Sequence, residues 1–460
     1  MRNRYLYITL LAILGFSAES QGLAIRQTPR LVVSIQIDQL TSDALENYAP
    51  AYGDDGLRRL LNQGLVFKHA SYTFEPVDAA SASATIATGS TPYYHGITAS
   101  EWFSREAMRQ LDILYDREHK QSPAQLMVST LGDEMKVATD GASRVYAFAP
   151  TAECAILSAG HAADGAAWIQ QGHWKMSSYY APVDYWLRGF CRDYVPDADT
   201  NMSVAKAAVF CIDKTTVGQD DNVDLLSISL TVKPTIDSYL SLDQSLAFII
   251  NGITSRIPLE RVLFVVTCTG IREEEEENDN SNNERFRIPS GKFYTGRTAG
   301  LLNMYLGAVY GSAQYIEANY KNQLFLNHKL IESKNINMGD ILRQSQEFLL
   351  QMAGVRNVYT SHQLMTSDSP KLERIRNGHC VDRSGDLIIE VAPGWKIINE
   401  DTKTSYTSRS ALAQFPIIFF GNELPAQQVE RPVTTEHIAP TVARCIRIRA
   451  PNACQAEPLF

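Results

Sequence analysis

The chain has 460 residues, of which 45% are hydrophobic and 20% are charged, as in a globular protein with a sizeable core. Lys and Arg number 42 and Asp and Glu number 51, which gives a net charge of −9. Nucleic-acid binding needs a clustered basic surface, and because the sequence has no basic cluster, it excludes DNA and RNA as main partners.

The N-terminus has the layout of a secretory signal peptide. A basic "MRNR" precedes the apolar run "YLYITLLAILGF", and the small residues Ala18 and Ser20 follow. The apolar run is shorter than the ~18 residues that a membrane span needs. We therefore predict a signal peptide over residues 1–20 and cleavage before Gln21. The exported chain is then expected in the periplasm or the cell envelope, without spanning a membrane. A buried first strand or helix is the alternative.

An α/β sheet is predicted from short apolar runs that alternate with helical patterns. The first run, residues 31–37, ends at Asp38 and precedes a helical stretch, so an acidic side chain lies at the carboxyl end of a strand. Further strands are expected over 145–150, 224–230, 261–267, 386–391 and 415–421, and helices over 242–253 and 338–352. This alternation predicts a mostly parallel sheet with helices on both faces.

The chain has seven cysteines. In an exported protein they permit disulfides, and the odd number leaves at least one thiol unpaired. Cys445 and Cys454 are close enough in sequence to pair. The sequence has no C-x-x-C motif, so the cysteine spacing does not favour a structural metal site.

Residues 272–284, "REEEEENDNSNNE", form an acidic run of low complexity. We interpret it as a solvated surface loop, and an acidic docking segment is the alternative. The chain has no internal repeat and no linker rich in Pro, Gly or Ser. It is therefore expected to fold as one large domain with insertions.

Seven stretches, in order along residues 31–460, resemble the alkaline phosphatase superfamily. Within it they are similar to the type I phosphodiesterase/nucleotide pyrophosphatase-like branch and its exported bacterial phosphate monoesterases. The stretches are "VSIQIDQLTSD", "YGDDGLRRLLNQGLVFKHASYTFEP", "TIATGSTPYYHGITASEWF", "AILSAGHAADGAAW", "NGHCVDRSGDLIIEVAPGW", "FPIIFFG" and "EHIAPTVARCIRIRAPNACQAEPL". The resemblance implies a three-layer sandwich with a central, mainly parallel mixed sheet. It implies a single domain over residues 24–460, with cap insertions at roughly 100–220 and 272–385.

The chemistry that the resemblance implies is phosphoryl transfer by two Zn²⁺ ions, which hold the attacking hydroxyl and the leaving oxygen in line. Asp and His side chains at several strand ends would bind the metals, and a Thr or Ser hydroxyl would attack. Cationic or amide side chains would clamp the phosphate oxygens.

The nucleophile of that chemistry is missing from its position. Asp38 matches the first metal ligand, although an Asp that caps the following helix would look the same. Three residues after Pro76, where the resemblance places the attacking hydroxyl, stands Ala79. Ser81 and Ser83 are the nearest hydroxyls, but each is displaced on a loop where ~1 Å decides reactivity. We expect the small residues here to pack at the start of a helix.

The phosphate clamp is changed in the same way. Ser100 stands at the position of an amide side chain, and Thr151 and Glu153 stand where the resemblance implies Lys and Arg. A carboxylate at position 153 would repel a phosphate dianion instead of stabilising it. The sequence therefore predicts no phosphate clamp.

The later metal-ligand loops have also lost their side chains. The first contains Lys233 and Pro234, has no His, and has Asp237 as its only carboxylate, which we interpret as a turn residue. Residues 268–270 are Cys-Thr-Gly in place of Asp-His-Gly, and the last His position is Gln414. Of six expected Asp and His ligands one remains, so no zinc cofactor is expected.

The nine histidines offer no substitute site. His95 and His161 match framework positions of the family, and we expect both to be hydrogen-bonded structural residues. The other seven show no H-x-H or H-x-x-x-H spacing. A relocated metal site therefore has no specific pattern behind it.

These observations favour an exported pseudophosphatase of the alkaline phosphatase superfamily. It would act as a binding or scaffolding subunit in the cell envelope, with a protein partner that the sequence does not identify. The alternative is a phosphoric ester hydrolase with a rearranged site around Asp38, Asp78 and Ser81. A ligand-sensing or lectin-like role for a metal-free cleft is a third possibility.

Overall fold

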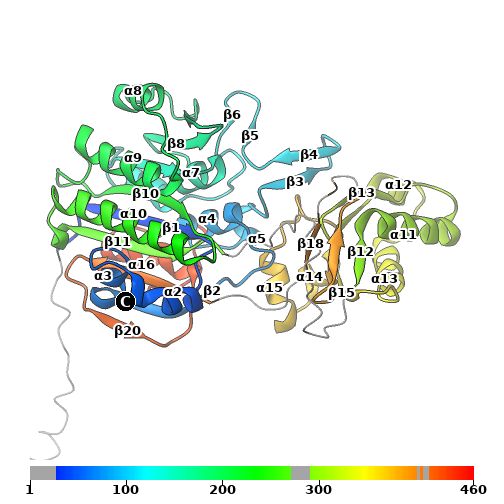
Figure 1. Cartoon of the computed structure of the whole chain (residues 1–460). Coiled ribbons are helices and arrows are strands. Elements are labelled where there is room, and N and C mark those ends of the chain that lie inside the picture. The colour runs from blue at the N-terminus through cyan, green and yellow to red at the C-terminus, as the bar shows by residue number, and fades with distance from the viewer. Residues whose placement is uncertain (1–26, 271–290, 401–402, 404, 408–413) are drawn as a thin grey trace, which may run out of the picture.

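The computed structural model describes residues 27–270, 291–400, 403, 405–407 and 414–460, in two lobes (Figure 1). The predicted signal peptide and the acidic run at 272–284 lie outside these residues. Among the described helices, none combines the length and apolar character that crossing a bilayer requires.

The larger lobe is built on a ten-stranded mixed sheet. Its strand order is β20-β2-β19-β11-β1-β10-β7-β8-β9, and β21 pairs with β2. The strands are β1 (Leu31–Asp38), β2 (Leu65–Ser71), β7 (Val145–Ala149), β8 (Gly165–Gln170), β9 (His173–Met176), β10 (Asp224–Thr231), β11 (Val262–Cys268), β19 (Phe415–Gly421), β20 (Gln427–Val429) and β21 (Val433–Thr434). The five central strands, β11, β1, β10, β7 and β8, are parallel to one another.

The predicted central strands are confirmed with one exception. The run at 386–391 forms β16 (Leu387–Val391), which lies in a second sheet and pairs antiparallel with its neighbours. The strand predicted for this run is confirmed, but it does not belong to the central sheet, and a buried apolar run looks alike in either sheet. Strand β19 is antiparallel to both β11 and β2, so the central sheet is mixed.

Helices cover both faces of the central sheet, with α9 and α10 on one face and α4, α7 and α16 on the other (Figure 1). The helices of this lobe are α2 (Ser42–Tyr48), α3 (Leu57–Gln63), α4 (Ala79–Thr88), α5 (Pro92–His95), α6 (Leu131–Ala138), α7 (Ala152–Ala159), α8 (Tyr185–Asp193), α9 (Thr200–Lys214), α10 (Ile236–Thr254) and α16 (Ile438–Cys445). The predicted helix at 242–253 lies within α10.

Strand β1 shows how the sheet orients Asp38. Val32, Ser34 and Gln36 face α4, α6, α7 and α16. Because side chains alternate along a strand, Asp38 belongs to the same set and faces the same helices. It lies at the carboxyl end of β1, beside Thr231 of β10. Ligand sites of open α/β sheets gather at this edge.

The smaller lobe has a hydrophobic core of its own. Its four-stranded antiparallel sheet has the order β13-β14-β16-β15, and a second sheet has the order β12-β17-β18. The elements besides β16 are β12 (Lys292–Tyr294), α11 (Thr295–Tyr310), β13 (Ile316–Tyr320), β14 (Gln323–Leu326), α12 (His328–Ser333), α13 (Met338–Leu349), β15 (Val355–Thr360), α14 (Ser361–Thr366), α15 (Glu373–Asn377), β17 (Lys396–Ile398) and β18 (Ser405–Thr407). The predicted helix at 338–352 is therefore confirmed as α13.

Two short hairpins project from the larger lobe within residues 100–220. Strands β3 (Glu101–Ser104) and β4 (Arg109–Asp112) form the first, and β5 (Tyr115–Asp116) and β6 (Lys120–Gln121) form the second. The same range contributes β7, β8 and β9 to the central sheet. Next to β3, the guanidinium of Arg105 donates to Asp386 and Glu317 of the smaller lobe. The first hairpin thus joins the two lobes.

Candidate functional site

Asp38 lies where the sequence places the first metal ligand, at the end of a parallel strand. It is 8% exposed, and the hydroxyl of Thr269, just after β11, donates to its Oδ1 at 3.1 Å. The Asp38 carbonyl accepts from the Val232 amide at 3.0 Å, which holds the strand end beside β10. A buried carboxylate is therefore present, with a hydroxyl beside it.

The helix that follows the predicted nucleophile loop is held by Asp78. Its side chain accepts from the Ser81 amide at 2.9 Å, and the Ser81 hydroxyl bonds the Asp78 amide at 3.0 Å, which completes a capping box. The second carboxylate oxygen of Asp78 accepts from the amide and the hydroxyl of Ser100 at 2.8 and 3.1 Å. The structure thus brings the nucleophile loop and the clamp position Ser100 together.

Ala79 is the first residue of α4, and its side chain is buried. It is 3% exposed and belongs to an apolar cluster with Ala80, Ala155 and Cys154. The nearby hydroxyls do not replace it, because Ser81 is committed to the capping box and Ser83 is fully buried. The prediction that these small residues pack a helix start is confirmed, since all ten residues of α4 are buried.

The two predicted cation positions lie at the start of α7, which packs against α4. Thr151 is the N-cap residue of α7, and Glu153 lies in the first turn, where a carboxylate stabilises the helix dipole. Burial, reinforced by the Glu153 carboxylate, raises the pKa of the Cys154 thiol to about 12. This thiol stays protonated at neutral pH and is no substitute nucleophile.

The end of β11 is closed by packing. Gly270 has a φ of +97°, which favours glycine, and a Cβ there would lie 2.8 Å from a methyl carbon of Val77. The loop before α4 therefore rests against the residues that stand in place of Asp-His-Gly. The Cys268 carbonyl accepts from the Tyr72 hydroxyl at 2.6 Å, which ties this turn to β2.

The remaining predicted ligand positions point elsewhere. Lys233 and Pro234 are exposed, and Asp237 lies in the first turn of α10, so its interpretation as a turn residue was wrong. The cause is the Thr235 N-cap, which starts the helix earlier than the apolar pattern indicates. Gln414 is exposed, and its side-chain oxygen bonds Nδ1 of His69 at 2.8 Å.

The residues at this edge do not fit a zinc pair. Two zinc ions need several carboxylate and imidazole ligands that converge on them. Of the matched metal-ligand positions, Asp38 alone has such a group, and the Thr269 hydroxyl donates to it at 3.1 Å. Within the described ranges, which omit 271–290 and 408–413, no three His, Cys, Asp or Glu side chains are grouped closely enough to hold a metal.

The structural roles predicted for two histidines are confirmed. His95 bonds the Thr85 hydroxyl and the Ile97 amide, both at 3.0 Å, and burial lowers its pKa to about 3. His161 bonds Asp133 at 2.9 Å and the Leu126 carbonyl at 3.1 Å. The possible pairing of residues 445 and 454, both within the described chain, is not formed as a disulfide.

A surface pocket of about 470 Å³ lies near the amino ends of the central parallel strands, whereas Asp38 lies at a carboxyl end. It is lined by Leu126, Met127, Val128, Ser129, Asp133, Lys136, Val137, His161, Ala162 and Asn452. Its helix α6 packs Gly132 against Val145 and Leu225, near the amino ends of β7 and β10. Asp38 lies at the carboxyl end of the neighbouring strand, roughly 20 Å away at 3.3 Å per residue.

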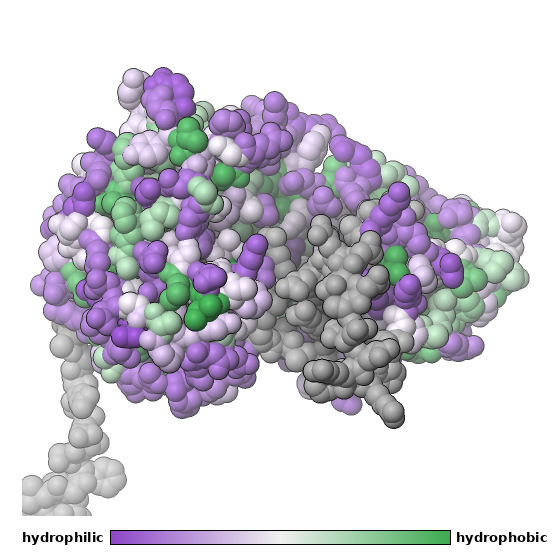
Figure 2. Space-filling model, in the orientation of Figure 1, coloured by the Kyte–Doolittle hydropathy of each residue, from purple (hydrophilic) through white to green (hydrophobic). Residues whose placement is uncertain are grey.

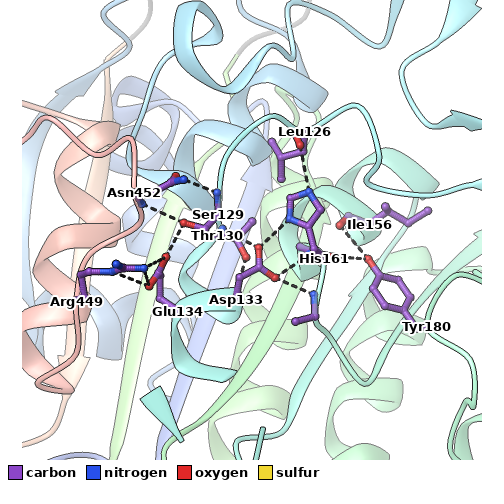
Figure 3. Close-up of polar contacts among 12 residues, drawn as sticks. Leu126, Ser129, Thr130, Asp133, Glu134, Ile156, His161, Tyr180, Arg449 and Asn452 are labelled. Carbon is purple, nitrogen blue, oxygen red and sulfur yellow. Dashed lines mark hydrogen bonds and ion pairs between the residues drawn. The ribbon is translucent and has the colours of Figure 1, made fainter. Parts of the chain in front are cut away.

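The polar floor of this pocket is a saturated hydrogen-bond network (Figure 3). Asp133 accepts from the amides of Thr130, His161 and Ala162 and bonds the His161 ring, at 2.8 to 2.9 Å. Arg449 pairs with Glu134 at 2.8 Å beside it. Because these groups satisfy one another, none of the described side chains of this network is a free acid, base or nucleophile. The floor is therefore fit to support a binding surface.

Two features of these sites were not predicted. The Thr269 hydroxyl reaches Asp38 only through the register of β1 and β11, for which the sequence has no local signal. The pocket floor did have a local sequence signal. Thr130 and Asp133 have the T-x-x-D spacing of a capping box, and the structure contains that box.

Comparisons with known proteins agree with the fold. The family model "Type I phosphodiesterase / nucleotide pyrophosphatase" matches residues 32–412. The chain is 24% identical to a protein of Myroides odoratus named calcium-transporting ATPase and 22% identical to alkaline phosphatase PafA of Elizabethkingia meningoseptica. Each match covers 94% of both chains.

A crystal structure of wild-type alkaline phosphatase PafA is similar in its fold. It superposes with a TM-score of 0.81 at 21% identity, over 94% of this chain and 98% of that one. The two-lobed architecture is thus a known arrangement.

Proposed function

The chain belongs to the type I phosphodiesterase/nucleotide pyrophosphatase family of the alkaline phosphatase superfamily, and from that premise we propose that it is an exported pseudophosphatase. It acts as a binding or scaffolding subunit in the cell envelope. The observation that carries the proposal is the start of α4, where the buried methyl of Ala79 stands in place of an attacking hydroxyl.

The electrostatics of the same edge support the proposal. The carboxylates of Asp38, Asp78 and Glu153 lie at this edge, and the described residues bring no Lys or Arg to the clamp positions. Phosphoryl transfer needs positive charge or hydrogen-bond donors around the transferring group. Here the donors near Asp78, the amide and hydroxyl of Ser100, already bond that carboxylate.

The pocket beside α6 supplies a place for a binding function. Met127 and Val137 are exposed at its rim, and the saturated network around Asp133 keeps its floor rigid. Exposed apolar side chains next to satisfied polar groups suit a protein partner, because association removes their apolar surface from water. The pocket lies away from Asp38, so binding there does not depend on hydrolase chemistry.

A second candidate is a phosphoric ester hydrolase with a rearranged site. The observation that favours it is the extent of the similarity to proteins named alkaline phosphatase, which reaches 94% of both chains for PafA. In this case the site is rearranged around Asp38, Asp78 and Ser81, with further ligands from positions other than those matched above.

Turnover of aryl phosphates separates the two candidates. We expect the purified protein, with Zn²⁺ added, to release nitrophenol from p-nitrophenyl phosphate and bis(p-nitrophenyl) phosphate no faster than a buffer blank. Ala79→Thr should remain equally inactive, because a hydroxyl alone lacks activating ligands. Capture of the same partner from envelope extract by the wild-type and Ala79→Thr proteins would support the scaffold. Metal-dependent turnover by the wild-type protein would refute the pseudophosphatase and favour the hydrolase.

A further inference from the structure

The central sheet of the larger lobe (Figures 1 and 2) has a polar patch on the face that packs against α4, α6, α7 and α16. On β1, Ser34 and Gln36 lie on this face. Ser34 is in register with Ser227 of β10, which lies on the same face. Gln36 is in register with Thr267 of β11. The strands of a parallel sheet that is covered on both faces normally carry apolar side chains. Buried polar side chains at these positions therefore need hydrogen-bond partners.

Two buried polar groups at this face have no hydrogen-bond partner among the described residues. Gln36 is 2% exposed, and its Oε1 accepts no hydrogen bond from them. Ser158, on α7, is 3% exposed, and its hydroxyl is unpaired in the same way. A buried polar atom that is left without a partner lowers the stability of the fold. The two groups therefore indicate a ligand between the sheet and the helices.

A cavity of about 20 Å³ lies between these two groups, and both line it. Ser34 and Ser227 line it as well. Ser34 is partly exposed although it lies in the middle of a central strand, which is consistent with its position at the cavity. A water molecule needs at least about 10–15 Å³ and roughly two to four polar partners. The cavity offers both.

The lining favours water over other ligands. Apart from the four polar residues just named, the described residues around the cavity are apolar or glycine, and none is charged. A cation would be buried there without a counter-charge. An apolar molecule would leave the amide and the hydroxyls unpaired. A water molecule both donates and accepts hydrogen bonds, so it can satisfy an amide and a hydroxyl together.

We propose that this cavity is an internal water-binding site, in which one water molecule hydrogen-bonds the side-chain amide of Gln36 and the hydroxyls of Ser34 and Ser158. The water joins β1 to α7. Because β1 ends at Asp38 and Glu153 lies in the first turn of α7, this link helps to set the spacing of strand and helix behind the edge that carries both carboxylates.

A crystal structure of the purified protein, at a resolution that places ordered water, tests the site. We expect one water within about 2.7–3.2 Å of the Gln36 amide and of at least one of the two hydroxyls. Gln36→Leu should lose this water, because it puts an apolar side chain in place of the amide. Ser245→Ala is the matched control and should keep the water, because the buried Ser245 hydroxyl bonds the Ser241 carbonyl within α10, on the other face of the sheet.

Magnetic relaxation dispersion of water measures the same property in solution. The number of long-lived internal waters should be lower in Gln36→Leu than in the wild type and unchanged in Ser245→Ala. If Gln36→Leu does not fold, the double variant Ser34→Ala and Ser158→Ala takes its place. A wild-type structure in which protein groups alone bond the Gln36 amide would overturn the proposal. So would a folded Gln36→Leu protein that keeps the water, or a metal ion in its position.

Discussion

Replacing Asp133 with asparagine is expected to lower the free energy of unfolding by about 3 kcal/mol. The carboxylate is 8% exposed and accepts from three amides and the His161 ring. An asparagine keeps the size but turns one acceptor into a donor, which faces N–H groups of Thr130 or His161. Denaturant titration at constant pH measures the loss, and the pocket floor beside α6 should lose its order with it.

The loss should depend on pH. Burial alone raises the pKa of Asp133, but the bonds from the His161 ring and the backbone amides outweigh it and hold that pKa below its ordinary value. The bond to Asp133 raises the pKa of His161. The Asp133 contribution is therefore present above about pH 4 and is lost as the pH falls through its lowered pKa. The His161 contribution is complete below about pH 6.5 and is lost as the pH rises through its raised pKa.

The free energies of unfolding of the wild-type and Asp133→Asn proteins should therefore differ most between about pH 4 and 6.5. Asp140→Asn is the matched control, because Asp140 is exposed just after the same helix and should change stability by no more than about 0.5 kcal/mol. Equal stability of the two variants across this range would contradict the role given to Asp133.

Arg105→Ala is expected to weaken the contact between the two lobes and to lower the free energy of unfolding by about 3 kcal/mol. The guanidinium donates to Asp386 at 2.6 Å, to Glu317 at 3.2 Å and to the Leu326 carbonyl at 2.9 Å. It also lies 5.0 Å from the centre of the Phe325 ring. Its removal leaves the mostly buried Asp386 carboxylate with only part of its partners, among them the His328 ring at 2.8 Å and the Leu326 amide at 2.6 Å.

Hydrogen exchange resolved along the chain measures this effect, because it separates the two lobes. The amides of β13, β14 and β16 should exchange faster in Arg105→Ala, while those of β1 and β10 should not. Arg109→Ala in the same hairpin is the control, since Arg109 contacts the Tyr115 ring of the larger lobe. Unchanged protection in the smaller lobe would show that the hairpin does not hold it.

The sequence was sufficient for the parts of the fold that depend on local patterns. Alternation of β-branched runs and helices located five of the six predicted strands in the central sheet, and small residues after Asp78 located the start of α4. The run that became β16 was misplaced, because membership of a sheet is decided by distant partners. Strands β14 and β15 pair with β16, and nothing in the residues of β16 itself indicates these partners.

The candidate site divides in the same way. That Ala79 lacks a hydroxyl, and that Gln414 is not a His, is readable from the chain once the resemblance fixes the positions. Which side chains occupy the place of the missing ligands cannot be predicted from the sequence. The hydroxyl of Thr269 against Asp38, and Val77 against Gly270, follow from strand register and loop packing.

Zinc binding to the purified protein tests the central claim, that the edge beside Asp38 no longer holds a metal pair. Protein stripped with a chelator and titrated with Zn²⁺ in a calorimeter should take up no stoichiometric zinc. Its melting temperature should not change with zinc concentration, because a ligand raises stability only by binding the native state. Uptake of two zinc ions per chain with a rise in melting temperature, both abolished by Asp38→Ala, would contradict the claim.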